Sequence, residues 1–259
     1  MTPGPQPGAV TRPTLKPFPL ALAALAAIIW LAGPTISALS AAGPPYKTQE
    51  PRVRLGQAEV LVTGPENFIR IDGLDRNLDD ILLATQSPAA AILGIFAEPG
   101  AWKEFQAAEA GQTRAGLHCH AIISTPAPLA ERTVTRAEFE DIGRDLIRNM
   151  SALVNKERRL EGDLAGISDH QVESAIGRIE SFTVLNQGPD HLTYRFESVL
   201  EMKLKEAPVP RVSRTATVSS TLLLDGKILN LQLMADPQGP PVRQLERIAG
   251  AWRNTFSRP

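Results

Sequence analysis

The alternation of apolar and polar residues in the second half of the chain predicts two successive hairpins. Residues 179–186 and 192–204 alternate with a period of two and are separated by Gln187-Gly-Pro-Asp190, a run of strong turn formers. Residues 212–224 and 227–234 alternate in the same way around Asp-Gly, the dipeptide that most strongly indicates a two-residue hairpin turn. In 192–204 one face is apolar and the other is mostly charged, which is typical of an antiparallel sheet with one solvated side.

A spacing of three to four residues replaces this alternation in two segments, and each of them predicts an amphipathic helix. Thr135-Arg-Ala-Glu138 has the sequence of a capping box, in which each side chain accepts a hydrogen bond from the backbone amide of the other residue. Apolar residues then recur at helical spacing as far as Val154, and a second series runs from Val242 to Phe256. Each apolar stripe is expected to pack on the sheet.

Shorter segments in the rest of the chain predict further strands and helical turns. The segments expected to be extended are residues 53–63, 68–71, 89–97 and 117–124. Helical turns are expected in residues 78–82, around Trp102 and Phe105, and within 166–177, and the charged run 156–163, with residual helical character, is expected to be a solvated face or a helix end.

Together these elements predict an α+β fold in which a single antiparallel sheet carries a long amphipathic helix and a C-terminal helix packed on it. Residues 52–259 contain no second linker and are expected to form one domain. The residues expected to share one core are Phe139, Leu146, Met150, Tyr194 or Phe196, Leu229 or Leu231, and Trp252.

The order of elements in residues 179–257 resembles the PsbP/Mog1-like α+β fold. This region reads strand, turn, strand, Asp-Gly hairpin and then a closing helix, and Thr221 to Leu233 looks like the hairpin that those proteins place before their last helix. The inserted helical region 135–177 departs from the simple family form. The resemblance implies a non-catalytic binding or assembly factor, although a fold by itself does not establish a function.

Residues 1–42 have the composition of a secretory signal peptide. Their only charged residues are Arg12 and Lys16, and an apolar core follows from Leu20 to Ala32. The small residues 38–42 match the requirements of signal peptidase, so we expect an exported domain of the periplasm or the extracellular space.

An uncleaved membrane anchor over residues 18–39 is the alternative to cleavage, since an apolar stretch extended to Leu39 just reaches the ~20 residues that span a bilayer. Residues 43–51 are rich in proline and are expected to be a short linker. A lipid anchor is excluded by the absence of a cysteine directly after the signal, because the single cysteine is Cys119.

Composition argues against a nucleic-acid partner. The chain has 27 Lys and Arg against 28 Asp and Glu, and no basic cluster is interleaved with aromatic residues. With one cysteine, no disulfide can form within the chain.

His118-Cys119-His120 is the one cluster that suggests a metal site. On a strand the two histidines lie on one face and the cysteine on the other, so the three side chains cannot share a metal. The other two histidines, His170 and His191, are distant in sequence. We therefore expect no metal, with Cys119 in the core beside Leu117, Ala121 and Ile123, and both histidines in solvent.

No catalytic motif is present: the chain has no G-x-S-x-G, no H-E-x-x-H and no glycine-rich phosphate loop. The acidic pairs Asp79-Asp80 and Glu140-Asp141 point in different directions on a helix and form no acid–base dyad. Trp102 and Trp252 are expected to pack in the core, although they could also line an apolar pocket.

A basic region of the sheet could face an anionic ligand, but interleaved carboxylates favour a solvated face with cross-strand ion pairs. Its basic residues are Lys203, Lys205, Arg211 and Arg214, and its acidic residues are Glu201 and Glu206.

These observations assign no catalytic, cofactor or metal residue. They favour a non-catalytic envelope protein that binds or assembles with an unknown protein or small molecule. The alternative is an exported protein that binds a small ligand or a metal, and an enzyme with scattered catalytic residues comes third.

Overall fold

The computed structural model describes residues 52–74, 90–107, 117–159, 172–204 and 211–256. The signal segment, the linker, the predicted helix at 78–82 with its acidic pair, and His170 lie outside the described residues. No helix within the described part of the chain has both the length and the apolar character to cross a membrane.

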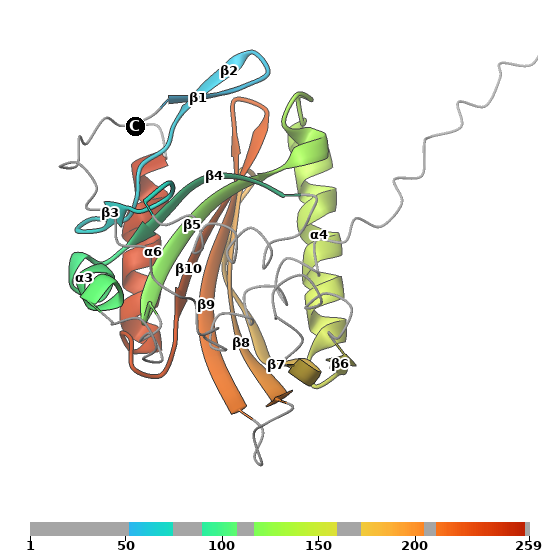
Figure 1. Cartoon of the computed structure of the whole chain (residues 1–259). Coiled ribbons are helices and arrows are strands. Elements are labelled where there is room, and N and C mark those ends of the chain that lie inside the picture. The colour runs from blue at the N-terminus through green and yellow to red at the C-terminus, as the bar shows by residue number, and fades with distance from the viewer. Residues whose placement is uncertain (1–51, 75–89, 108–116, 160–171, 205–210, 257–259) are drawn as a thin grey trace, which may run out of the picture.

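Eight antiparallel strands form the main sheet, in the order β3-β4-β5-β10-β9-β8-β7-β6. Its second half is the predicted meander of neighbouring strands, and β10 also pairs with β5, which joins the two halves of the chain (Figure 1). The strands are β3 (Ile69–Arg70), β4 (Ala90–Ala97), β5 (Cys119–Pro126), β6 (Glu157–Arg159), β7 (Val172–Gln187), β8 (His191–Leu204), β9 (Arg211–Leu224) and β10 (Lys227–Ala235).

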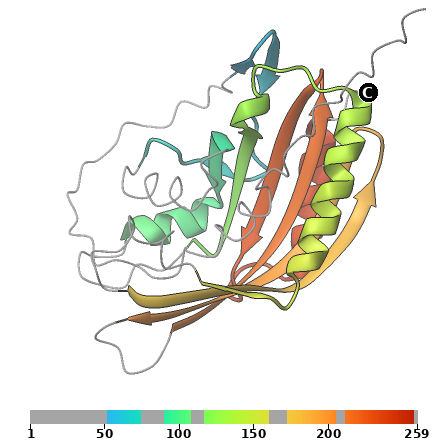
Figure 2. The same ribbon diagram turned by 90° about the vertical axis from the view of Figure 1, so that its right-hand side faces the viewer.

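Helices cover both faces of this sheet. The C-terminal helix α6 (Val242–Phe256) lies on one face, and α3 (Pro99–Ala107) and α4 (Arg136–Leu153) lie on the other (Figures 1 and 2). We call these the α6 face and the α4 face. A short 3-10 helix, η2 (Ala127–Leu129), follows β5. The α+β fold with helices packed on an antiparallel sheet is thus confirmed.

Local signals in the sequence account for the start of α4 and for the last hairpin. Thr135 and Glu138 form the capping box, with the Glu138 amide donating to Thr135 Oγ1 at 3.3 Å and the Thr135 amide donating to Glu138 Oε2 at 2.9 Å. Asp225 and Gly226 both have positive φ, 48° and 73°, as a type I′ turn requires.

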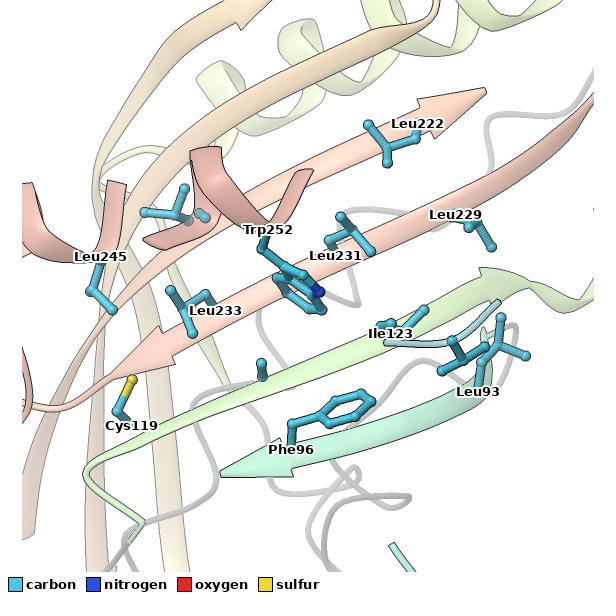
Figure 3. Close-up of a cluster of buried hydrophobic side chains, with 14 of the residues drawn as sticks. Leu93, Phe96, Cys119, Ile123, Leu222, Leu229, Leu231, Leu233, Leu245 and Trp252 are labelled. Carbon is cyan, nitrogen blue, oxygen red and sulfur yellow. The ribbon is translucent and has the colours of Figure 1, made fainter. Parts of the chain in front are cut away.

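The largest apolar cluster lies between α6 and the sheet. Alternate residues of β5 and β10 point into it, and Leu245 and Trp252 of α6 cover them (Figure 3). The indole Nε1 of Trp252 donates to the carbonyl oxygen of Thr63 at 2.7 Å, so the polar atom of this ring is satisfied. The strand residues of this cluster include Cys119, Ala121, Ile123, Leu229, Leu231 and Leu233.

The prediction of one shared core is wrong, because the expected core residues are divided between the two faces. Trp252 and Leu231 pack on the α6 face, whereas Leu146 of α4 packs with Tyr194 and Phe196 on the α4 face. Periodicity shows that a strand has two faces, but only the register between strands decides which faces coincide.

Three segments differ from their predicted conformation. Residues 53–63 form a separate hairpin, β1 (Arg52–Leu55) and β2 (Ala58–Leu61), in which Gly56 adopts the left-handed φ of 58°. The expected helical turns in 156–163 and 166–177 are contradicted where the chain is described, because β6 and the start of β7 are strands that pair with each other at Glu157–Arg159. A solvated charged run carries no periodicity that distinguishes a helix end from an edge strand.

Candidate functional site

Cys119 and His120 lie on opposite faces of the sheet, as alternation predicts, and His118 lies in the bend directly before β5. Cys119 is fully buried in the α6 core, where burial above all, and then the negative charges of Glu98 and Asp236, raise the pKa of its thiol to about 12. Such a thiol stays protonated and is no nucleophile at neutral pH. The expectation that Leu117 lies beside it is wrong, because Leu117 packs in the α3 cluster.

The expectation that both histidines face solvent is wrong for His120. Its side chain is only 5% exposed, and desolvation lowers its pKa to about 4, against smaller opposing effects of the Leu117 backbone and of Asp236. His118 is half-buried, with its Nδ1 2.8 Å from Asp236 Oδ2. The described residues contain no group of three His, Cys, Asp or Glu side chains that could hold a metal ion.

The His118–Asp236 pair belongs to a turn between β10 and α6. The second carboxylate oxygen of Asp236 accepts from the amides of Gln238 and Gly239 at 2.8 and 3.0 Å. A Cβ on Gly239 would lie 2.2 Å from the carbonyl oxygen of His118, so this turn is packed directly against the start of β5. The pair stabilises this connection.

The two candidate tryptophans are core residues. Trp102 and Trp252 are each 2% exposed, and Trp102 stacks on Phe105 with ring centroids 5.5 Å apart. Each lies in a closely packed cluster of apolar side chains, as expected.

On the charged surface of β7, β8 and β9, Arg214 forms a cross-strand ion pair, with a partner other than the carboxylates expected; Lys205 and Glu206 lie outside the described residues. Arg214 Nη1 lies 2.6 Å from Glu180, which also pairs with Arg178 at 3.2 Å. Glu140 and Asp141 are exposed on α4, and Asp141 pairs with Arg144. Glu180 therefore balances part of the positive charge of this surface.

A different site lies at the centre of the α4 face, where polar residues occupy positions that a core would ordinarily give to apolar ones. Alternate residues of β9 point to this face, and polar residues continue from Thr221 to Asn230 and Ser124, and from Ser219 to Gln232, on the neighbouring strands. We call this set the polar strip: Ser124 on β5, Asn230 and Gln232 on β10, and Ser213, Thr215, Thr217, Ser219 and Thr221 on β9.

Apolar flanks bound the polar strip on both sides. Toward β4, Ile95 and Ile122 pack under Trp102 of α3. Toward β7, Tyr194 and Phe196 pack under α4. In Figure 2 the strands that carry the strip run between α3 and α4, while α6 lies behind the sheet. Each helix therefore covers an apolar flank, and the polar strip lies between them.

The polar strip is buried and only partly satisfied by hydrogen bonds. Thr221 Oγ1 donates to Asn230 Oδ1 at 3.0 Å, and the buried hydroxyl of Tyr194 interacts with Ser219 and Thr221, which opposes the rise in its pKa caused by burial. Thr217 and Gln232 are 1% and 6% exposed, yet Thr217 Oγ1 and Gln232 Oε1 have no hydrogen-bond partner among the described residues. The same holds for Ser213 Oγ.

Unpaired buried polar atoms of this kind cost about 1–3 kcal/mol each. None of the eight side chains of the strip carries a charge, and the neighbouring His120 is neutral at pH 7 with a pKa of about 4. The strip can therefore donate and accept hydrogen bonds, but it offers no ionic partner.

The sequence contains the alternating serines and threonines of this site, but it does not show that they are buried. Serine or threonine stands at every second position from 213 to 221, which is the expected pattern of a solvated strand face. Only the placement of β9 at the sheet centre, between α3 and α4, shows that this face is buried.

The fold and the site define an α+β protein with an antiparallel sheet, helices on both of its faces and a buried uncharged polar strip on one of them. No protein-family model matches the chain, and no curated protein matches it in sequence. Among solved structures it is similar to a mutant form of the protein Mog1, with 8% identity over 79% of this chain and 85% of that one, and a TM-score of 0.23. This is the fold that the C-terminal third resembles in sequence; at this TM-score the match carries no argument about function.

Proposed function

We propose that this chain is an exported, non-catalytic binding protein that holds a small uncharged ligand against the polar strip. The observation that carries the proposal is the set of unpaired polar atoms on buried side chains, above all Thr217 Oγ1 and Gln232 Oε1. A ligand with hydroxyl or amide groups would supply the missing partners and offset the cost of burying them.

The chemistry of the strip favours binding over catalysis. A hydroxyl nucleophile needs a base within hydrogen-bond reach. In the described part of the chain, the titratable rings near the strip are those of Tyr194, whose pKa is raised by burial so that its phenol stays protonated, and of His120. Met234 of β10 stands between His120 and Thr217 in the strand register, which separates the two by about 10 Å. With a pKa of about 4, His120 is also a weak base.

Export is the second part of the proposal and depends on residues 1–42. Their positive start, apolar core and small residues at 38–42 support delivery to the periplasm or the extracellular space, with an anchor over 18–39 as the alternative. A partner protein bound through the same domain is the competing binding function.

Native mass spectrometry of the chain purified from the cell envelope without dialysis tests the binding proposal. We expect a mass above that of the polypeptide, and a neutral compound with several hydroxyl or amide groups released by denaturation. A native mass equal to that of the polypeptide alone would contradict the proposal.

Thr217→Val separates a ligand site from a purely structural strip. The substitution keeps the shape and removes the unpaired hydroxyl, so we expect the ligand-free domain to gain about 1–3 kcal/mol of stability and ligand retention to fall about tenfold. Thr183→Val on the exposed part of β7 is the matched control and should change neither. Equal ligand retention by the two variants would rule the strip out.

A further inference from the structure

Among the described strands, none pairs with the outer edge of β7 over its last seven residues, 181–187. β6 pairs with β7 only at Glu157–Arg159, and Val154 bridges to Ile179. Beyond that point no described strand pairs with the outer side of residues 181–187, and the side chains from Thr183 to Gln187 are exposed. Val184 and Leu185 are 36% and 38% exposed, and both are among the exposed large apolar residues of the described chain.

This open edge lacks the short length, the charged residues and the prolines that keep strand edges apart in monomeric proteins. β3 and β6, the terminal strands of the sheet, are two and three residues long, and β6 consists of Glu, Arg and Arg. Residues 181–187 contain neither a charged residue nor a proline. The protective features of this segment are two irregularities of the register with β8, one between Ile179 and Ser181 and one between Val184 and Asn186.

We infer that the β7 edge pairs with the β7 edge of a second copy of this chain. An antiparallel pair of identical strands is related by a two-fold axis, so the segment must be complementary to itself. With the axis at Val184, each Thr183 faces Leu185 of the second copy and no like charges are opposed. The two sheets would then continue into each other through main-chain hydrogen bonds.

A short edge interface predicts weak association, with a dissociation constant on the order of 10–100 µM. Sedimentation velocity of the purified domain over a range of concentrations around that value should show a reversible monomer–dimer equilibrium. Val184→Lys places two ammonium groups opposite each other at the axis, so we expect it to weaken dimerisation at least tenfold.

Val212→Lys is the matched control, because Val212 is an exposed valine on β9, 59% exposed and away from this edge. It should dimerise like the unmodified chain. Hydrogen exchange of the unmodified chain gives a test that needs no variant: the amides of residues 181–187 should exchange more slowly in concentrated than in dilute solution.

Three outcomes overturn the inference. A chain that stays monomeric throughout the concentration range would show that the β7 edge does not pair with a second copy. Dimers weakened equally by both lysine variants, or exchange at 181–187 that does not depend on concentration, place any self-association elsewhere.

Discussion

At the scale of single residues, the polar groups buried at the sheet centre affect the stability of the fold and its dependence on pH. His120 lies next to the polar strip, is 5% exposed, and remains neutral in the folded state to about pH 4. Thr217 Oγ1 and Gln232 Oε1 are buried and have no hydrogen-bond partner in the described part of the chain. Buried polar atoms without partners make the α4 face less stable than an apolar face of the same shape.

His120 predicts a specific loss of stability in mild acid. Between its ordinary pKa of 6.5 and its folded pKa of about 4, the unfolded chain binds a proton that the folded chain does not. Stability therefore falls as the pH is lowered through this window, by a total of about 3 kcal/mol. Denaturant unfolding at pH 7 and pH 4.5 measures the effect.

His120→Asn should remove this part of the pH dependence. Asp190, whose pKa is lowered from 3.8 by a hydrogen bond from His191, titrates below pH 4.5, so the difference between variants at pH 4.5 and above carries the result. His191→Asn is the control, because His191 is part-exposed beside Asp190. Equal slopes for both variants would show that His120 does not titrate as its burial requires.

At the scale of elements, α4 and α6 pack on opposite faces of the sheet, and different interactions fix their positions. α4 begins at a capping box that its own sequence specifies. The position of α6 depends instead on long-range contacts. Trp252 packs on the strands of the α6 face, and its indole Nε1 donates to the carbonyl oxygen of Thr63, 189 residues earlier in the chain.

Trp252→Ala should lower the free energy of unfolding by about 3–5 kcal/mol, the usual cost of removing a large buried aromatic side chain. The substitution leaves a cavity in the α6 core and an unpaired carbonyl at Thr63. Arg247→Ala, on the exposed side of the same helix, should change stability by no more than about 0.5 kcal/mol. A loss under about 1 kcal/mol for Trp252→Ala would mean that α6 does not hold this core together.

At the scale of the whole molecule, the proposed export predicts that residues 1–42 are removed by signal peptidase. N-terminal sequencing of the protein from the cell envelope should find a mature chain that begins at Ala41 or Gly43, because Ala38-x-Ser40 and Ser40-x-Ala42 both match a cleavage site. An intact form that begins at Met1 and resides in the membrane would establish the anchor instead.

Ser40→Arg tests both candidate cleavage sites with one substitution. Ser40 occupies a required small position in both sites, so arginine there should block both cleavages and leave the uncut chain in the membrane fraction. Thr35→Arg, outside both motifs, is the control for the added charge. Normal cleavage of Ser40→Arg would show that neither site is used.

The sequence by itself determined several elements whose signals are local, although it missed the turn at Gly56 between β1 and β2. The capping box of α4, the Asp-Gly turn before β10, the alternation of β8 to β10 and the apolar stripe of α6 each depend on residues a few positions apart, and all appear in the structure. The burial of Cys119 followed in the same way, from alternation along one strand.

Only the tertiary structure decided which faces of those elements meet. The pairing of β5 with β10 brings together residues more than 100 positions apart, and it places the serines and threonines of β9 in the interior instead of in solvent. It also buries His120 and divides the expected single core in two. Strand alternation has a period of two whichever side faces water, so the inner side is set by the register with distant strands and by the helices that cover it.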